Sequence, residues 1–143
     1  MKNFFLTLII AIIAFSNVIG QNTTPVEPEN PNAPVIKFES EVYDYGKVPI
    51  NGNGMCQFKF TNTGKEPLLL TNVKASCGCT VPSWPRDPIP PGESGVIDVK
   101  YTTMSRAHTI NKSITVFSNA SNTTVILRLK GEVINNPTPE DAQ

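Results

Sequence analysis

Apolar and polar residues alternate with a period of two through much of this chain. Residues 55–62 read MCQFKFTN, which places Cys56, Phe58 and Phe60 on one face and polar side chains on the other. The same alternation recurs in three later segments, 96–101, 112–117 and 124–130. It is typical of β-strands that bury one face in a core and expose the other to water.

The segment 68–75, LLLTNVKA, breaks this regularity. Leu68 and Leu70 share a face, whereas Val73 falls on the opposite one. A β-bulge between them would restore the phase of the strand, and partial burial of both faces is the alternative. Two shorter edge segments, 35–38 and 42–46, precede these strands.

Together the segments predict about seven short strands, and no helical periodicity extends beyond two turns. Turn-forming sequences rich in Asn, Gly and Pro separate them. Strands of this number and spacing favour an all-β fold in which two antiparallel sheets pack face to face, an immunoglobulin-like β-sandwich. A closed barrel is the alternative. The strands occupy residues 35–134, a span of 100 residues without an internal repeat, so we expect one domain.

The two ends of the chain predict export and flexible tethers. Residues 1–20 carry a single lysine, then an almost unbroken apolar run and a polar stretch with slender residues before position 21. This layout is typical of a secretory signal peptide, and the apolar run is short for a membrane span. We expect residues 21–34 to form a disordered Pro-rich linker and residues 135–143 a disordered tail. No later run is apolar enough for a transmembrane helix, so the predicted location is the periplasm or the cell surface.

The charge balance argues against a nucleic-acid partner. The chain has 12 basic and 12 acidic side chains, and removal of residues 1–20 would take only Lys2 from this count. Neither a basic stripe nor a strong net charge is present, so nothing predicts attraction to phosphate backbones or anionic membranes.

A Pro-rich segment follows the irregular strand. Five prolines fall within residues 82–91. Proline lacks a backbone N–H and restricts φ, so we expect an extended crossing here rather than a strand. Trp84, the only tryptophan, has two interpretations: a half-buried cap on one end of the core, or an exposed contact for a partner.

The three cysteines leave several alternatives open. Cys56 shares a face with two phenylalanines, so on its own it is typical of a small buried apolar residue. A disulfide from Cys56 to Cys77 or to Cys79 is one option, and a bridge between Cys77 and Cys79, with Gly78 relieving its strain, is another. With three thiols, one is left unpaired.

Cys77 and Cys79 also suggest a functional site. Two thiolates two residues apart on an extended segment could chelate a soft metal such as Cu(I) or zinc, or take part in thiol redox chemistry. The only histidine, His108, and nearby Met104 are the remaining candidates for soft-metal ligands, but no spacing places them beside the cysteines.

Catalytic motifs are not apparent elsewhere. A Ser-His-Asp triad would require His108, and no spacing supports the roles of its partners. We find no phosphate-binding glycine loop, no HExxH motif and no calcium-binding loop. We therefore predict a protein that is not an enzyme and needs no cofactor.

Several short motifs together resemble a known family. They are YGKV at 45–48, FTNTG at 60–64, CGCT at 77–80, PGE at 91–93 and ITVFSN at 114–119. The combination is similar to a bacterial family of exported immunoglobulin-like domains of unknown function, common in Bacteroidetes and related to Hydin-like and major-sperm-protein-like sandwiches. One departure is the segment 105–110, SRAHTI, where that family usually has a Gly-rich hairpin. The resemblance implies a sandwich fold and export, but it implies no activity.

These observations favour a non-catalytic module of the cell envelope that binds or scaffolds an unidentified envelope protein. Recognition would use a sheet edge, to which a peptide adds a strand, or the loop that carries Trp84. The alternative hypothesis is a metal-binding or thiol-redox protein that uses Cys77 and Cys79.

Overall fold

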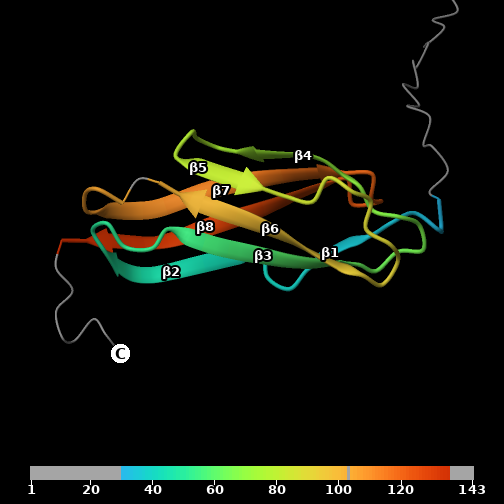
Figure 1. The fold of residues 1–143 in the computed structure, drawn as a ribbon, viewed down its shortest axis with the longest axis horizontal. Helices are drawn as coiled ribbons and strands as arrows, with labels where there is room; N and C mark the ends of the chain where they lie inside the picture. The colour runs from blue at the N-terminus through green and yellow to red at the C-terminus, as the bar shows by residue number, and fades with distance from the viewer. Residues whose placement is uncertain (1–29, 103, 136–143) are drawn as a thin grey trace, which may run out of the picture.

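The computed structural model describes residues 30–102 and 104–135, and this part of the chain is built from eight β-strands (Figure 1). In chain order they are β1 (Ile36–Phe38), β2 (Val42–Pro49), β3 (Met55–Asn62), β4 (Leu70–Ala75), β5 (Thr80–Ser83), β6 (Ser94–Tyr101), β7 (His108–Ser118) and β8 (Thr124–Ile134).

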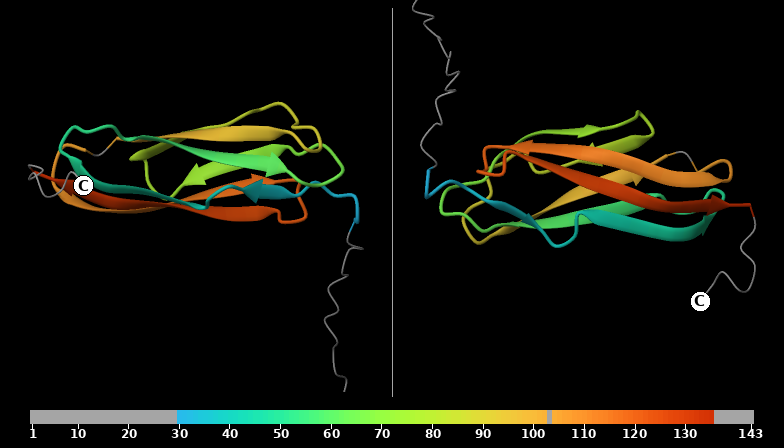
Figure 2. Two further views of the ribbon diagram at one scale, coloured as in Figure 1. Left: turned by 90° about the horizontal axis from the view of Figure 1, so that it is seen from below. Right: turned by 180° about the vertical axis from the view of Figure 1, so that it is seen from behind.

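The strands form two four-stranded sheets that lie one on the other (Figure 2). The first sheet has the order β1–β3–β6–β5 and the second has the order β2–β8–β7–β4. The predicted all-β immunoglobulin-like sandwich is confirmed. One pair departs from the antiparallel rule, because β2 runs parallel to β8, while the other neighbouring strands are antiparallel.

The predicted alternation orients the strands. In β3, Cys56, Phe58 and Phe60 are buried, whereas Gln57 and Lys59 are exposed. The inward side chains of β6, β7 and β8 complete the same core; they are Ile97, Val99, Tyr101, Ile110, Ile114, Val116, Leu127, Leu129 and Val133. Removal of this apolar surface from water is the main force that holds the sheets together.

The irregular segment contains the bulge that its sequence suggested. The pairing of β4 with β7 shifts register between Leu70 and Asn72. This shift brings Leu70 and Val73 to the buried face together. Leu68 lies before the strand and forms an isolated bridge with Ile89.

The Pro-rich segment differs from its prediction, because its first residues form the strand β5 instead of a crossing. β5 is the outermost strand of the first sheet and pairs only with β6. Pro82 lies opposite Val99 in β6. Tyr101 donates its N–H to Gly54 O of the β3 side at 2.8 Å, and because backbone groups two residues apart point the same way, the N–H and C=O of Val99 also face β3. The nitrogen of Pro82 therefore faces away from β6, where no N–H is needed. A proline is tolerated at such an edge position.

The predictions for residues 1–20, 21–29 and 136–143 lie outside the described residues. The last five residues of the expected linker, 30–34, are described and contact the domain. Pro34 O accepts the backbone N–H of Ser121 at 2.9 Å, and the Asn30 amide donates to Glu66 Oε1 at 3.2 Å. Within the described residues, no helix has the length and apolar character that crossing a bilayer requires.

Candidate functional site

The first sheet has an edge that its outer strand covers only in part. β1 pairs with the last three residues of β3, Phe60 to Asn62, and Glu39 N–H then donates to Lys59 O at 3.0 Å. β3 itself begins five residues earlier, at Met55. In the described chain, no strand pairs with residues 55–58 on this side. The beginning of β3 is therefore an open edge.

The orientation of the backbone shows which groups this edge offers. Gly54 O accepts the Tyr101 N–H and therefore faces β6. The backbone N–H and C=O groups of Cys56 and Phe58, at alternate positions along the strand, face β6 as well. Lys59 O faces the opposite side, toward β1. Because successive residues of a strand alternate, the N–H and C=O of Gln57 also face the open side. One donor and one acceptor thus lie at the open edge in the geometry of a sheet ladder.

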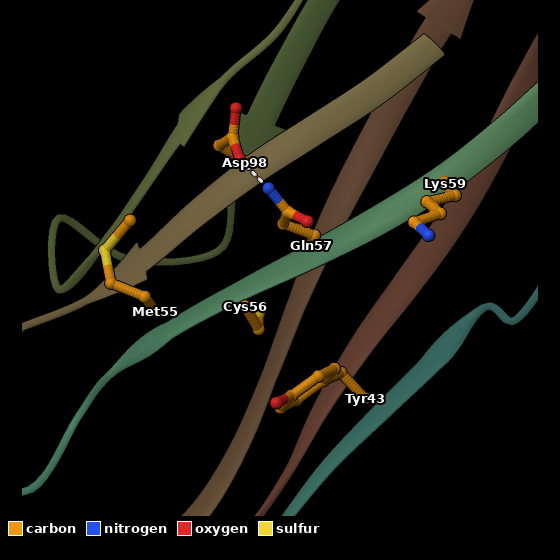
Figure 3. Close-up of a pocket in the computed structure, with 6 residues that line it drawn as sticks. All are labelled: Tyr43, Met55, Cys56, Gln57, Lys59 and Asp98. Carbon is orange, nitrogen blue, oxygen red and sulfur yellow. Dashed lines mark hydrogen bonds between the residues drawn. The ribbon is translucent and has the colours of Figure 1, made fainter. Parts of the chain in front are cut away.

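A groove runs beside this edge, between β3 and β2. Its larger part is an open pocket of about 450 Å³ that has lining residues on both sides of the β3 backbone (Figure 3). These residues are Tyr43, Met55, Cys56, Gln57, Lys59 and Asp98. A second pocket of about 140 Å³ shares Tyr43, Gln57 and Lys59 with the first and extends to Glu39 and Val42. Because of these shared lining residues, we call the two pockets together the β3 groove.

The two walls of the β3 groove differ in chemistry. On the inner side, the Tyr43 ring packs edge-on against Tyr45 at 4.9 Å and against Phe58 at 6.4 Å between centroids. On the outer side, the Gln57 amide donates to Asp98 Oδ1 at 2.8 Å, with exposed Lys59 beside it. The groove is therefore apolar and aromatic within and polar at its rim, a combination typical of peptide-binding surfaces.

Cys56 contributes a buried, unpaired thiol to this groove. Burial raises the pKa of the Cys56 thiol, and it also raises the pKa of the neighbouring Tyr45. The Tyr45 hydroxyl donates to Gly54 O at 2.8 Å. A thiol with a raised pKa is a poor nucleophile at neutral pH. Cys56 therefore serves as a packing residue, as its position among the phenylalanines predicts.

Of the predicted bridges, the structure contains the one between Cys77 and Cys79. The bridge lies in the turn between β4 and β5, and both cysteines are half-buried. In this oxidised form the two sulfurs are not available as thiolate ligands. Among the described residues, no group of three or more Cys, His, Asp or Glu side chains is arranged to hold a metal ion. The metal hypothesis concerns the reduced chain and stays a prediction.

The other candidate ligands are engaged elsewhere. His108 begins β7, and its Nε2 lies 2.7 Å from the Tyr101 hydroxyl while its Nδ1 lies 2.7 Å from Arg106 O. Met104 is buried, and its backbone carbonyl accepts the N–H of Asn51 at 2.8 Å. The segment that departs from the usual Gly-rich hairpin thus leads directly into β7.

Trp84 lies just after β5 and packs, half-buried, against the core. The Arg86 guanidinium lies 3.8 Å from the ring centroid of Trp84, so a cation–π contact covers one face of the indole. The structure thus shows the core contact of Trp84. Its role as a partner contact stays a prediction.

Comparison with protein families decides the family of the chain. The model of the DUF1573 family, described as a protein of unknown function, matches residues 36–133, which include all eight strands except the last residue of β8. The chain belongs to the DUF1573 family. This membership agrees with the predicted resemblance to a family of unknown function, while export and the CGCT hallmark stay predictions. No curated protein matches this DUF1573 chain.

Solved structures support the fold of this DUF1573 domain. A protein of unknown function from Porphyromonas gingivalis matches with a TM-score of 0.64 at 18% identity, over 78% of this chain and 51% of that one. The chain thus spans about half the length of that protein. The PapD-like domain 7 of human CEP192 matches with a TM-score of 0.61 at 9% identity, over 78% of this chain and 94% of that one. The Escherichia coli chaperone DraB matches with a TM-score of 0.51 at 13% identity, over 75% and 60%. At these identities the likeness shows the fold alone.

Apart from Cys56, the residues of the β3 groove were not singled out by their sequence. Gln57 and Lys59 are typical of the solvent face of any half-buried strand. The available signal is a difference in length, since the short apolar segment 35–38 precedes an alternating segment twice as long at 55–62. Such a mismatch leaves part of the longer strand uncovered only when the two strands are neighbours, and the sequence of this DUF1573 chain does not show that pairing.

Proposed function

We propose that this DUF1573 domain is a non-catalytic binding module that captures an extended segment of another protein by strand addition at the open edge of β3. The observation that carries the proposal is that the N–H and C=O of Gln57 face the β3 groove and have no strand partner within residues 30–102 and 104–135. Main-chain hydrogen bonds to such an edge supply affinity, and side-chain pockets beside it supply specificity.

The opposite edge of the same sheet is poorly suited to strand addition. At β5, the outward positions are Thr80 and Pro82. Thr80 N–H donates to Cys77 O at 3.3 Å, and proline has no N–H. A proline at an edge blocks further pairing. Of the two edges of this sheet, the one at β3 is therefore the better template.

The walls of the groove define the expected ligand. Alternate side chains of an added strand point to opposite faces, so every second residue would enter the space beside Tyr43 and Cys56. Small or medium apolar side chains suit that space. The intervening residues would lie over Gln57, Lys59 and Asp98, where polar side chains remain in contact with water. The ligand is therefore a segment of alternating apolar and polar residues.

The cellular setting is part of the same proposal. The signal-like sequence of residues 1–20 supports export, and the partner would then be another protein of the cell envelope. A non-catalytic role is supported by the raised pKa of the Cys56 thiol in the groove, which makes that thiol a poor nucleophile at neutral pH.

The test compares the loss of the backbone N–H of Gln57 with the loss of its side chain alone. Extended peptides would be selected from a displayed library against the wild-type chain, and their binding measured by calorimetry. Gln57→Pro removes the N–H at the edge without touching the ladder with β6, so it should weaken binding at least tenfold. Gln57→Ala keeps the N–H and should change binding less than threefold.

Three results bear on the proposal. Circular dichroism that matches the wild type would show that both variants are folded. Selected peptides that bind Gln57→Pro as tightly as the wild type would contradict strand addition at β3. A library that yields no binding peptide at all would contradict the module's role as a peptide receptor.

A further inference from the structure

A disulfide lies in the turn between β4 and β5, and β6 separates β5 from β3 in the strand order of the first sheet (Figure 1). Cys77 and Cys79 are separated by two positions in the sequence and are both half-buried. Gly78 between them is exposed, and a Cβ at this position would meet no neighbouring atom within 4 Å. The turn therefore leaves free space around Gly78, beside the half-buried bridge.

The bridge is not needed to hold this turn in place. On one side, Ser76 N–H donates to Ser113 O at 2.9 Å, and Ser113 N–H donates to Ser76 Oγ at 3.2 Å. On the other side, Thr102 N–H donates to Cys79 O at 2.9 Å. A bridge that closes so short a loop also restricts the unfolded chain very little. The turn should therefore keep its place when the disulfide opens.

The two sulfurs are not equivalent. Cys79 packs against the hydrophobic core, and Cys77 is not among the described residues that do, so Cys77 is the candidate for attack from solvent. The Thr80 hydroxyl oxygen lies 3.9 Å from Cys79 Sγ and 3.8 Å from Cys77 Sγ, and Thr80 is only 3% exposed. A buried hydroxyl at this distance can donate a hydrogen bond to a thiolate that forms beside it.

We propose that the Cys77–Cys79 bridge is a thiol–disulfide exchange site that accepts two electrons from a dithiol of another protein. A thiolate of that protein attacks Cys77 Sγ, the bond between the two sulfurs breaks, and Cys79 leaves as a thiolate beside Thr80. The second thiol of the substrate then loses its proton. The resulting thiolate attacks the sulfur of the first substrate cysteine in the mixed disulfide and releases Cys77 as a thiolate.

The exchange is balanced without another reagent. The substrate loses two electrons and two protons and gains a disulfide. Cys77 and Cys79 gain those electrons and protons and become two thiols. The site acts independently of the β3 groove, so either proposal can fail without the other.

The first experiment measures whether the bridge exchanges in the folded chain. The full chain carrying Cys56→Ala would be incubated in mixtures of reduced and oxidised glutathione, alkylated and weighed by mass spectrometry. We expect complete and reversible conversion between disulfide and dithiol, with an unchanged circular dichroism spectrum. A bridge that resists excess reduced glutathione until the chain is unfolded would overturn the proposal.

The second experiment tests electron transfer to a substrate. The oxidised chain would be mixed with a reduced model peptide that contains two cysteines, and the peptide products quantified by chromatography. We expect one peptide disulfide for each bridge consumed. A bridge that glutathione reduces but that leaves the peptide dithiol unchanged would also overturn the proposal.

Single substitutions test the roles of the individual residues. With glutathione disulfide as the probe, Cys77 in Cys79→Ser should form the mixed disulfide several times faster than Cys79 in Cys77→Ser, because Cys79 packs against the core. Thr80→Val should slow opening of the wild-type bridge by roughly tenfold through loss of the hydroxyl donor, and Thr80→Ser should restore most of the rate. Equal rates for the two cysteine variants would overturn the assignment of Cys77 as the attacked residue, and an unchanged rate in Thr80→Val would overturn the role of Thr80.

Discussion

The two ends of β3 belong to one strand and one core, yet they are held in different ways. At the end of the strand, β1 covers residues 60–62, and the fully buried Asn62 side chain bonds four backbone groups of the surrounding loops. At the beginning, residues 55–58 have β6 on one side and the β3 groove on the other. The covered end stabilises the fold, and the uncovered end leaves backbone groups for a partner.

The first prediction has the largest expected effect and concerns amide exchange. Cys56 N–H and Phe58 N–H face β6, whereas Gln57 N–H between them faces the groove. Exchange at the protected positions requires opening of the core, which commonly costs several kcal/mol. Gln57 N–H should therefore exchange at least ~1,000-fold faster than its neighbours. Hydrogen exchange followed by NMR measures this ratio, and similar protection of all three amides would show that the edge is not open.

The second prediction compares two asparagines at the ends of β3. Asn62→Ala removes hydrogen bonds to Gly64 N–H, Glu66 O and Ile89 O within the buried interior. Buried groups left without partners should lower the free energy of unfolding by about 3 kcal/mol. Exposed Asn53 at the open end accepts only Met55 N–H, so Asn53→Ala should cost about 0.5 kcal/mol. Urea denaturation measures both values, and equal costs would contradict the difference between the two ends.

The third prediction concerns the outer edge of β5, where Pro82 blocks further strand pairing. Pro82→Val gives β5 an outward N–H next to exposed Val81, which is 53% accessible. Stability should change by less than about 1 kcal/mol, because Pro82 contributes no bond to β6. Self-association should increase, since an unblocked edge can pair with a second molecule. Sedimentation equilibrium measures self-association, and a variant that associates no more than the wild type at any concentration would show that Pro82 does not block this edge.

The fourth prediction concerns pH and has the smallest expected effect. Burial raises the pKa of the Cys56 thiol above its ordinary value of 9.0, so the unfolded chain loses this proton at lower pH than the folded chain. The contribution of the protonated Cys56 thiol to stability is complete below pH 9.0, the ordinary pKa of the thiol. It is lost as the pH rises toward the pKa of the folded chain, so the free energy of unfolding falls over this range. Cys56→Ala should make the decline shallower. Thermal unfolding of both chains at a series of pH values checks this, and identical slopes would exclude a contribution from Cys56.

The elements that could be predicted were those with a regular pattern. The segment 55–62 alternates from Cys56 onward, and the structure places its strand at the same residues. The shift of phase between Leu70 and Val73 was enough to suggest the bulge. β5 was missed because prolines argue against a strand, and their compatibility with it depends on which side of Pro82 meets β6. That orientation is a property of the sheet and is not visible in local sequence.

The candidate sites also divide into residues that the local sequence singled out and residues that only the structure revealed. Cys77 and Cys79 were recognised because two cysteines around one glycine are conspicuous, although three bridges were compatible with the sequence. The structure selects the bridge between them and leaves Cys56 in the core. Gln57 carried no signal, since its side chain is an ordinary exposed amide and the relevant groups belong to its backbone.

The sequence by itself determined the class of fold and the buried face of each regular strand, because alternation and turn residues act over a few neighbouring positions. Only the tertiary structure decided that β1 stops beside Phe60, that β2 runs parallel to β8 and that Pro82 lies at an edge. These features depend on contacts between segments far apart in the chain. Whether a backbone N–H or C=O group is hydrogen-bonded depends on the strand beside it in the sheet, and the local sequence does not show which strand that is.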